Sequence, residues 1–560
     1  MTDSVLNDTI VESAQERHNS KEKRVILLNR PYPFYELPQI ESLRDMIRQQ
    51  VEENPNRIAF RFRQGREIVQ KTILQFSEDI DAVGTWLFHE GIQNSHIALI
   101  APNSYLWLVV YFAVISSGNV IVPIDKDLTI AELEKLLLHS ESTCVFAADK
   151  IAGQLEKSRR VLPFKDLDAI IEQGRSLVAS GDTSFTGYNQ DVHQLSTIVY
   201  TSGTTGDSKG VMLTQANLLA DINTGCRLFK PGDRSLSVLP FHHMFGLAVA
   251  LLMLVNWRST VFINSGLRYL MQDFQEARPL TTMLVPLHLQ TFHKMIVERA
   301  KKEGKYKKLR AGMKLSLFLY SLGIDVLKKL MQEVRKPFGG DLEYIIVGGA
   351  ALDPFYEREY RAWGIDLIPA YGATECSPGI ACGRNHYHRE GSVGKPIDCL
   401  ELRIADDGEV MIRGENVMKG YWHDEQATAQ ALKDGWYMSG DIGHLDKDGF
   451  LFLTGRKKNL IILSDGENVS PEKLESQIGL IEGVSEVLVY QEDDAIVAEI
   501  YPDDAYAGRQ EWFDEQIKKY NNSLPPAQRI RNVKLRTEPF PKNTSRKILR
   551  HQTGKEKKDV

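Results

Sequence analysis

Two hydrophobic spacings alternate along residues 42–147 of the chain. After Ser42, apolar residues recur every three or four positions until Pro55, which predicts a helix that begins at a capping serine. The same spacing predicts further helices at residues 80–91, from 104, and around 133–137. Short apolar runs, typical of buried strands, occupy residues 58–62, 97–101, 120–123 and 143–147. Because strands alternate with helices, the predicted fold class is α/β, with parallel or mixed sheets flanked by helices.

Two longer apolar runs, residues 105–115 and 244–255, are shorter than the roughly 20 residues that a membrane-spanning helix needs. Both are therefore predicted as buried helices. Residues 1–25 are polar, without the basic and then apolar pattern of a signal peptide, and are predicted as a disordered tail. These features favour a cytoplasmic protein that contacts a membrane at most peripherally.

The bulk composition narrows the class of protein. A chain of 560 residues is too long for one hydrophobic core, so several domains are expected. Its 42% hydrophobic and 25% charged residues are usual for a soluble globular protein. The net charge of −6 argues against general nucleic-acid binding, which needs a basic surface. The few cysteines lack a metal-ligand spacing and are predicted to be reduced and mostly buried. They are Cys144, Cys226, Cys376, Cys382 and Cys399.

The candidate chemistry starts at residues 199–211, Val-Tyr-Thr-Ser-Gly-Thr-Thr-Gly-Asp-Ser-Lys-Gly-Val. A β-branched run leads into hydroxyls and glycines between Thr201 and Gly206, followed by Lys209, and a helical segment begins near Thr214. Glycines let successive backbone amides point into one concavity, hydroxyls add donors, and the lysine adds a positive charge. This composition predicts a polyphosphate-binding loop, and a flexible polar loop is the alternative. The Walker pattern is absent from the string.

The string resembles the phosphate loop of the acyl-adenylate-forming superfamily. That superfamily contains acyl-CoA synthetases, firefly-luciferase-like enzymes and the adenylation domains of nonribosomal peptide synthetases. It usually has proline where this chain has Ser208. The resemblance implies ATP as the nucleotide, Lys209 as a catalytic cation and Thr201 as a ligand of Mg²⁺. It further implies phosphate contacts from Thr201, Ser202, Gly203, Thr204, Thr205 and Gly206.

Residues 236–245 predict an apolar strand that ends in an aromatic and imidazole cluster. Side chains alternate across a strand, so at most one of His242 and His243 is expected to face a site. A structural role for both is the alternative. In the superfamily, a histidine in a Pro-x-x-His-x-x-Gly setting borders the acyl pocket, and His243 has this spacing from Pro240 and Gly246.

Two further strings carry groups that suit a nucleotide. Residues 344–351 predict a buried strand followed by glycines, which allow a flat ligand close to the backbone. Residues 371–375, Tyr-Gly-Ala-Thr-Glu, place an aromatic ring, a hydroxyl and a carboxylate within five positions. The resemblance implies that Tyr371 stacks on adenine, that Thr374 binds phosphate and that Glu375 holds Mg²⁺, for which a hard oxygen ligand is suitable. It assigns to the same nucleotide site Gly349, Ala350 and Gly372.

Another group of motifs follows at residues 435–459. The Asp-Gly pairs at residues 407–408 and 448–449 are predicted as hairpin turns. Asp441 lies outside these turns, and an acidic residue is the usual acceptor for both hydroxyls of a ribose. The resemblance assigns that role to Asp441, with Arg456 beside it.

The resemblance divides the chain at Lys458, the position of the superfamily's hinge. It implies a large AMP-binding domain at residues 26–457 and a small, mobile α+β domain at residues 458–560. In the superfamily the small domain rotates between two half-reactions, so Lys547 serves adenylation and the loop around Gly466 then reaches the thiol channel. The usual glycine before the catalytic lysine is Arg546 here.

The implied reaction has two halves. A carboxylate attacks the α-phosphorus of MgATP, giving an acyl-adenylate and pyrophosphate, and a thiol then displaces AMP. Residues 242–244 lack the aspartate that amino-acid-activating relatives use for a substrate ammonium. A carboxylic acid with a hydrophobic tail is therefore favoured. The strings Gly-Gly-Ala-Ala at residues 348–351 and Ser-Asp-Gly-Glu-Asn at residues 464–468 resemble those of long-chain fatty acyl-CoA synthetases. This resemblance implies a medium- or long-chain fatty acid with coenzyme A as acceptor. Transfer to the phosphopantetheine of an acyl carrier protein is the alternative, and an inactive nucleotide-binding scaffold is a remote one.

One segment lies outside this chemistry. Residues 301–310 are strongly basic, and residues 313–330 are rich in Leu, Phe and Tyr. A solvated loop beside a packed helix is the default interpretation. A surface that contacts anionic lipid, or that admits a hydrophobic substrate, is a second hypothesis.

Overall fold

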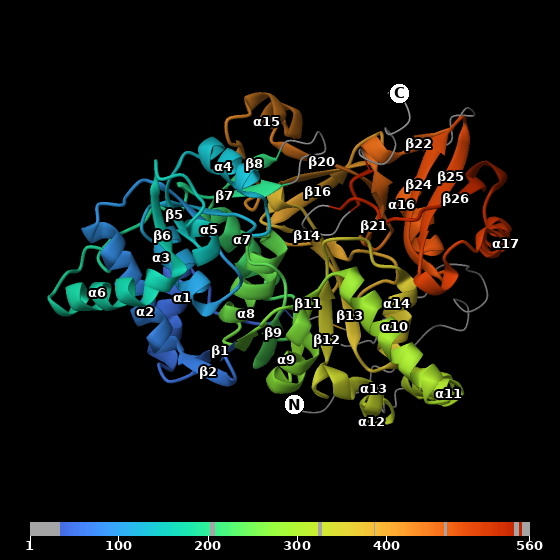
Figure 1. Ribbon diagram of the computed structural model, residues 1–560, viewed down its shortest axis with the longest axis horizontal. Helices are drawn as coiled ribbons and strands as arrows, with labels where there is room; N and C mark the ends of the chain where they lie inside the picture. Colours follow the sequence, from blue (N-terminus) through green and yellow to red (C-terminus); the bar gives the residue numbers. More distant parts are fainter. Residues whose placement is uncertain are drawn as a thin grey trace, which may run out of the picture. The chain divides into compact units, whose positions relative to one another are not determined.

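The computed structural model describes residues 34–201, 208–322, 327–385, 387–463, 468–542 and 548–550. The chain divides into two units, and Figure 1 shows the elements of both. Unit 1 comprises residues 1–201, 208–401 and 412–437, and unit 2 comprises residues 202–207, 402–411 and 438–560. Unit 2 thus holds residues on both sides of Lys458, and the predicted hinge there stays a prediction. The predicted tail at residues 1–25 lies outside the described residues.

One sheet of unit 1 has the strand order β18-β8-β7-β4-β3-β5-β6. Its strands are β3 (His96–Ile100), β4 (Val120–Pro123), β5 (Ser142–Ala147), β6 (Arg160–Pro163), β7 (Leu195–Thr201), β8 (Lys209–Thr214) and β18 (Gly420–Tyr421). The strands from β7 to β6 in this order run parallel, whereas β8 is antiparallel to β7, and β18 to β8. The predicted strands at residues 97–101, 120–123 and 143–147 correspond to β3, β4 and β5.

A second sheet of unit 1 has the order β15-β14-β13-β12-β11-β9-β10-β1-β2. Its strands are β1 (Ile58–Gln64), β2 (Glu67–Thr72), β9 (Arg234–Ser237), β10 (Thr260–Ile263), β11 (Thr281–Leu284), β12 (Tyr344–Val347), β13 (Asp366–Gly372), β14 (Gly379–Cys382) and β15 (Lys395–Pro396). The strands from β13 to β1 run parallel, and antiparallel strands close both ends. The prediction of parallel and mixed sheets is confirmed.

Helices of unit 1 separate most of these strands in the sequence, as the alternating spacing predicts. They are α1 (Leu43–Glu53), α2 (Ile73–His89), α3 (Tyr105–Ile115), α4 (Ile130–His139), α5 (Asp149–Ala152), α6 (Leu167–Ala179), α7 (Gln215–Gly225), α8 (Met253–Asn256), α9 (Leu270–Ala277), α10 (Pro286–Lys302), α11 (Tyr306–Ser321), α12 (Leu327–Leu330), α13 (Gln332–Arg335), α14 (Pro354–Ala362) and α15 (Glu425–Ala431). The Ser42 side chain caps α1 by accepting from the Asp45 amide, and Ser104 caps α3 in the same way from Trp107. Both predicted helix starts are confirmed.

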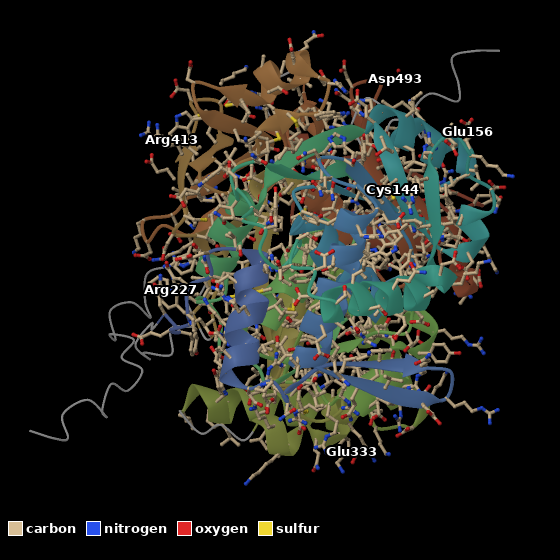
Figure 2. The ribbon with its side chains drawn as sticks, turned by 90° about the vertical axis from the view of Figure 1, so that its left-hand side faces the viewer. Cys144, Glu156, Arg227, Glu333, Arg413 and Asp493 are labelled. Atoms are coloured by element: carbon tan, nitrogen blue, oxygen red, sulfur yellow. The ribbon has the colours of Figure 1, made fainter. Side chains whose placement is uncertain are left out.

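The two long apolar runs are buried helices. Every residue of α3 except the half-buried Leu106 is buried, and residues 244–255 form a π-helix, Phe245–Leu252, that continues into α8. No helix among the described residues combines the length and the apolar character needed to cross a bilayer. The cysteines are all free thiols and all but Cys399 are buried, as predicted. Cys144, labelled in Figure 2, lies on β5.

The prediction of a strand over residues 236–245 is wrong in its extent. Strand β9 ends at Ser237, and residues 241–243 form a turn before the π-helix. Gly246 explains the turn, because a Cβ at this position would lie 1.9 Å from the Pro240 carbonyl oxygen. Only glycine permits the chain to fold back so closely.

Unit 2 is an α+β unit, as the sequence predicts for the C-terminal region. Its three-stranded sheet has the order β24-β25-β26 and is packed by α16 and α17. These elements are β24 (Val484–Glu492), β25 (Ala495–Pro502), β26 (Ile530–Leu535), α16 (Pro471–Ile478) and α17 (Gln510–Asn521). A small sheet pairs β22 (Ile461–Ile462) with β23 (Asn468–Val469). A further five-stranded sheet contains residues that belong to both units. It is built from β16 (Leu400–Ile404), β17 (Glu409–Gly414), β19 (Leu432–Lys433), β20 (Trp436–Leu445) and β21 (Leu451–Arg456).

Candidate nucleotide-binding site

The β7–β8 hairpin carries the predicted phosphate loop. Thr201 ends β7 and is paired in register with Lys209, which begins β8. The antiparallel pairing holds the two ends of the loop together. The predicted phosphate ligands Ser202, Gly203, Thr204, Thr205 and Gly206 lie outside the described residues.

Glu375 lies in a tight turn after β13. A short 3-10 helix spans Thr374–Cys376, and both Thr374 and Glu375 are half-buried. Gly372 allows the approach of the strand that follows, because a Cβ there would lie 2.1 Å from the Pro378 carbonyl oxygen. The turn is therefore fixed by backbone contacts that a larger residue at position 372 would break.

A second strand-forming segment, residues 415–422, holds this turn from the other side. The amide of Asn416, which is fully buried, donates to the carbonyl oxygens of Cys376 and Gly379 at 2.8 and 2.7 Å. The backbone amide of Met418 donates to the carbonyl oxygen of Glu375 at 2.8 Å. The segment then pairs with β8 through β18. Residues around 210, 375 and 420 are thus joined into one structure.

Tyr421 connects the two predicted parts of the site. Its hydroxyl donates to Glu375 Oε1 at 2.8 Å, and the Lys209 ammonium lies 4.9 Å from the centroid of its ring. Burial, and then the charge and hydrogen bond of Glu375, raise the pKa of Tyr421 well above its usual value. The phenol therefore stays protonated and remains a donor to the carboxylate.

The electrostatic setting of Glu375 suits a hard cation. Within the part of the chain that the structure describes, its carboxylate has a neutral hydroxyl as partner and forms no ion pair. A carboxylate that is not already neutralised keeps its charge for Mg²⁺, which prefers few protein ligands and takes the rest from phosphate and water. The described residues contain no group of three or more His, Cys, Asp and Glu side chains that could hold a metal alone. Glu375 thus fits Mg²⁺ that arrives with a nucleotide.

Tyr421 and Asn416 were missed by reasoning from the sequence. The string Asn416-Val-Met-Lys-Gly-Tyr-Trp422 combines a polar side chain, a glycine and aromatic rings within seven positions. That mixture of residue types is the signal that could have identified the string as part of a candidate site. Only the pairing of β18 with β8 shows that the string reaches Glu375.

The other predicted nucleotide residues of unit 1 gather at one sheet edge. Gly349 and Ala350 follow β12, and Tyr371 lies near the end of β13, its parallel neighbour. Gly349 has φ +81°, a conformation that favours glycine, and both Gly349 and Ala350 are exposed. Ligands of open α/β sheets bind outside the carboxyl ends of the strands, so this edge is where a nucleotide is expected.

The two adjacent histidines follow β9 at the same edge. Because residues 241–243 form a turn and not a strand, the rings of His242 and His243 lie side by side, with centroids 4.2 Å apart. The expectation that alternation separates them is therefore wrong. His242 Nε2 lies 3.5 Å from Asp125 Oδ2, but no hydrogen bond joins the two groups. The role of His243 at the acyl pocket stays a prediction.

Unit 2 contains Asp441 and Arg456 as a cross-strand pair. They are opposite each other on β20 and β21, and Arg456 Nε lies 2.8 Å from Asp441 Oδ1. The Asp441 side chain is only 10% exposed, whereas that of Arg456 is 48% exposed. The turn before it is fixed by the Gly440 amide, which donates to Glu409 Oε1 at 2.9 Å. The structure therefore confirms that Arg456 lies beside Asp441.

The flanks of the predicted catalytic lysine are also anchored in unit 2. Lys542 and Ile548 form an antiparallel bridge, and Lys542 Nζ lies 2.5 Å from Glu486 Oε1. Arg550 binds the Glu475 carboxylate and donates to the Val489 carbonyl oxygen. Lys458 is exposed in the 3-10 helix Lys457–Asn459. The predicted residues Gly466 and Lys547, and the unusual Arg546, lie outside the described residues.

Comparison with known proteins decides the family. A family model described as AMP-binding enzyme matches residues 47–422. The chain belongs to this family. The match includes Lys209, Glu375 and Tyr421, whereas Asp441 and Arg456 follow it in the sequence.

Relatives of this AMP-binding protein are CoA ligases. The long-chain-fatty-acid–CoA ligase FadD15 of Mycobacterium tuberculosis is 30% identical over 452 residues, covering 75% of this chain and 74% of the relative. A 2-succinylbenzoate–CoA ligase of Geobacillus sp. is 29% identical over 525 residues, covering 89% and 94%. The long-chain-fatty-acid–CoA ligase 1 of Homo sapiens is 26% identical over 487 residues, covering 77% and 69%.

Solved structures agree with the fold. The anthranilate CoA ligase AuaEII in complex with anthranoyl-AMP has a TM-score of 0.75 at 19% identity, over 92% of this chain and 97% of that one. The ATP-bound MatB of Rhodopseudomonas palustris has a TM-score of 0.73 at 22% identity, over 91% and 98%. The α/β architecture of this AMP-binding protein is therefore that of adenylate-forming enzymes.

Proposed function

We propose that the protein is an AMP-forming acid–CoA ligase that activates a medium- or long-chain fatty acid. The arrangement of Lys209, Tyr421 and Glu375 is the observation that supports this proposal most directly. The Lys209 ammonium lies over the ring of the buried Tyr421, and the Glu375 carboxylate, which suits Mg²⁺, accepts from the hydroxyl of the same residue. A cation beside a carboxylate that can hold a metal suits a nucleoside triphosphate, which needs both positive charge and a bridging metal.

The first half-reaction brings two anions together, so electrostatic repulsion is its main obstacle. Bound Mg²⁺ would supply positive charge that stabilises the phosphate oxygens as the acid attacks. Glu375 would hold that ion, and the Tyr421 hydroxyl would fix the orientation of the carboxylate. The Lys209 and Lys547 ammonium groups would stabilise negative charge that develops on the pentavalent phosphate and the leaving pyrophosphate.

Asp441 would position the nucleotide by binding its ribose. A nearly buried carboxylate can accept hydrogen bonds from both ribose hydroxyls. Arg456, already paired with Asp441, would hold its oxygens in place. Tyr371 and the backbone at Gly349 and Ala350 would bind adenine, as the resemblance implies. The domain boundary at Lys458 and the use of Lys547 remain part of this proposal.

Two features support an acid without an ammonium group. The turn after β9 presents histidines, and the nearby carboxylate of Asp125 lies within 3.5 Å of His242. The Asp125 carboxylate thus already has a protein side chain close to it. The fatty-acid ligase and the 2-succinylbenzoate ligase match this chain at similar sequence identity. This similarity supports an aromatic acid as the second candidate substrate. Coenzyme A is the acceptor named for these relatives, and an acyl carrier protein is the alternative acceptor.

Pyrophosphate release across a panel of acids tests the proposal. The panel comprises octanoate, palmitate, 2-succinylbenzoate and an amino acid, each with coenzyme A and with acyl carrier protein. We expect release with the two fatty acids, AMP as the second product, and thioester only with coenzyme A. A preference for 2-succinylbenzoate would select the second candidate. No AMP with any acid would support the inactive scaffold instead.

A further inference from the structure

The outward face of α11 is unusual because it is apolar along half of its length. Leu315, Phe318 and Leu322 are 50%, 60% and 60% exposed. They are spaced at i, i+3 and i+7, so they form one stripe along the helix and its C-terminal cap. Single exposed apolar side chains are common, but three large ones in a helical row need an explanation.

The opposite face of α11 packs normally against unit 1. Met313 and Ser316 are buried, and the Ser316 hydroxyl donates to the Ala362 carbonyl oxygen of α14 at 3.4 Å. Arg310 Nη1 lies 2.6 Å from Glu359 Oε1, also on α14. The orientation of α11 is therefore fixed by its inner face, and the outward apolar stripe follows from it. Figure 1 shows α11 beside α10 and α14 at the margin of unit 1.

Positive charge surrounds this stripe. Residues 294–314 contain nine Lys and Arg against two Glu, although the whole chain has a net charge of −6. The exposed residues that continue the stripe toward the N-terminal end of α11 are Lys307, Lys308, Ala311 and Lys314. The outward face thus consists of lysines followed by large apolar side chains, with no acidic residue among them.

We propose that α11 docks the protein onto an anionic membrane surface. Leu315, Phe318 and Leu322 would insert at the level of the head groups, and Lys307, Lys308 and Lys314 would face anionic lipid. We call these six residues the docking face. A helix with basic and large apolar side chains directed to one boundary is the usual design for binding in the plane of an interface.

The type of cation favours lipid over a protein partner. Protein interfaces are enriched in Arg and depleted in Lys, whereas every cation of the docking face is lysine. Lysine stems can lie along apolar surface while the ammonium reaches a phosphate layer. The lysines are the only side chains of the docking face that can form hydrogen bonds, and none of the six side chains is an acceptor. An acidic protein such as an acyl carrier protein is therefore an outcome to be tested.

This inference does not depend on which acid the enzyme activates. Co-sedimentation with vesicles tests it on the full-length protein, using phosphatidylcholine alone and equal parts of phosphatidylcholine and phosphatidylglycerol. We expect binding to the anionic vesicles at ~0.1 M salt, and much weaker binding at ~1 M salt or to the neutral vesicles.

Two variants separate the contributions of the docking face. K307E/K308E/K314E should weaken binding to anionic vesicles about a hundredfold, since a lysine near such a surface contributes about 1 kcal/mol. L315S/F318S/L322S should weaken it at least tenfold and leave the remaining binding more sensitive to salt. Matched controls are K447E/K518E/K519E, with exposed lysines of unit 2, and L138S, at a leucine of α4 that is 75% exposed. Both controls should bind as the parent does.

Activity toward octanoate in vesicle-free buffer separates this inference from the proposed function. The docking variants should retain that activity, because none of the six residues belongs to the nucleotide site. The proposal is overturned by absent binding to anionic vesicles, or by equal loss in the control variants. It is also overturned if acyl carrier protein, and not lipid, binds the parent and is lost with K307E/K308E/K314E. An enzyme that is inactive with every acid but binds vesicles through this face would contradict only the proposed function.

Discussion

Two carboxylates that the sequence predicts as nucleotide ligands, Glu375 in unit 1 and Asp441 in unit 2, have opposite surroundings. Glu375 accepts from the neutral hydroxyl of Tyr421, which itself contacts a lysine through its ring. Asp441 is nearly buried and forms an ion pair with the guanidinium of Arg456. The first carboxylate thus has a neutral hydrogen-bond donor beside it, whereas the second has a cation beside it.

This difference suits the two roles proposed for these carboxylates. A divalent cation is held by net charge, so a neutral partner that only orients the carboxylate is suitable. A sugar hydroxyl is held by geometry, so a guanidinium that fixes the carboxylate improves the site. We therefore expect that removing the charge of each residue will have effects of different size, and that the two variants will change different kinetic constants.

The largest effect is expected for Glu375→Gln, which should slow pyrophosphate release about a thousandfold, at the upper end of the ~10²–10³ range for losing an electrostatic stabiliser. Excess Mg²⁺ should restore part of the rate, since amide oxygen is a weaker ligand. The matched control is Glu401→Gln, at an exposed residue paired with Arg413 (labelled in Figure 2). A rate within tenfold of the parent would exclude Glu375 as the metal ligand.

Lys547→Ala tests the cation that unit 2 is predicted to supply. We expect adenylation to slow at least a hundredfold, on the same scale of about 10²–10³. Formation of thioester from prepared acyl-AMP should largely survive, because that step develops no charge on a transferring phosphate. Single-turnover assays of each half-reaction measure both, with Lys519→Ala on α17 as control. Equal loss in both steps would argue against a role confined to adenylation.

Asp441→Asn should raise the KM for ATP about ten- to a hundredfold and change kcat less, because a hydrogen bond to a charged group contributes ~1.5–3 kcal/mol. The partner Arg456 is half exposed, so it can hydrate when the pair is lost and the fold should persist. Asp448→Asn, in an exposed turn of the same unit, is the control. A change in kcat alone would assign Asp441 to the chemical step.

A third carboxylate, Asp221 on α7, extends the comparison to stability. Burial raises its pKa to about 8, and the Gly379 amide, which donates to it at 3.1 Å, offsets this only in part. Above the unfolded pKa of 3.8 the native state therefore holds a proton that the unfolded state has released. The unfolding free energy should fall as pH rises toward 8, by at most ~1.4 kcal/mol per pH unit.

Urea denaturation from pH 5.5 to 8.5 measures that slope. Asp221→Asn should flatten it, because the amide keeps the acceptor oxygen without titrating. Asp168→Asn, at an exposed position of α6, should leave the slope unchanged. A parent protein whose stability rises with pH over this window would show that Asp221 is ionised in the native state.

The smallest effect is expected for Tyr421→Phe. It removes one hydrogen bond to Glu375, a contribution of ~0.5–1.5 kcal/mol, and keeps the ring beside Lys209. The apparent Mg²⁺ affinity should fall a few-fold while the rate at saturating Mg²⁺ is almost unchanged. Magnesium titration of pyrophosphate release measures this, with Tyr269→Phe, at a 39% exposed residue, as control. A loss as large as that of Glu375→Gln would give Tyr421 a catalytic role.

Much of the fold was predictable because it depends on local spacing. The strands β3, β4 and β5 and the helices α1 and α3 lie where their apolar runs and capping serines indicate. The failure at residues 236–245 has a local cause as well: the approach of Gly246 to the Pro240 carbonyl ends the strand early. Single residues that permit a close contact are hard to weigh from composition alone.

The candidate site was predictable as a set of motifs but not as a network. Glycines, hydroxyls and a lysine before β8, and a carboxylate after β13, could be recognised from the chemistry that a nucleotide needs. Tyr421 could not, because its contact with Glu375 spans 46 residues and depends on the pairing of β18 with β8. Its aromatic side chain has the same local pattern as a core residue.

The sequence by itself determined where most helices and strands lie, and which strings carry the groups that a nucleotide needs, because both depend on a few neighbouring side chains. The tertiary structure decided which carboxylate accepts from a neutral hydroxyl and which pairs with a guanidinium, since the partners come from other strands. It also decided that α3 is buried except at the half-buried Leu106, whereas α11 exposes an apolar stripe. Both helices are rich in apolar residues, and only packing against the rest of unit 1 determines which of these side chains water can reach.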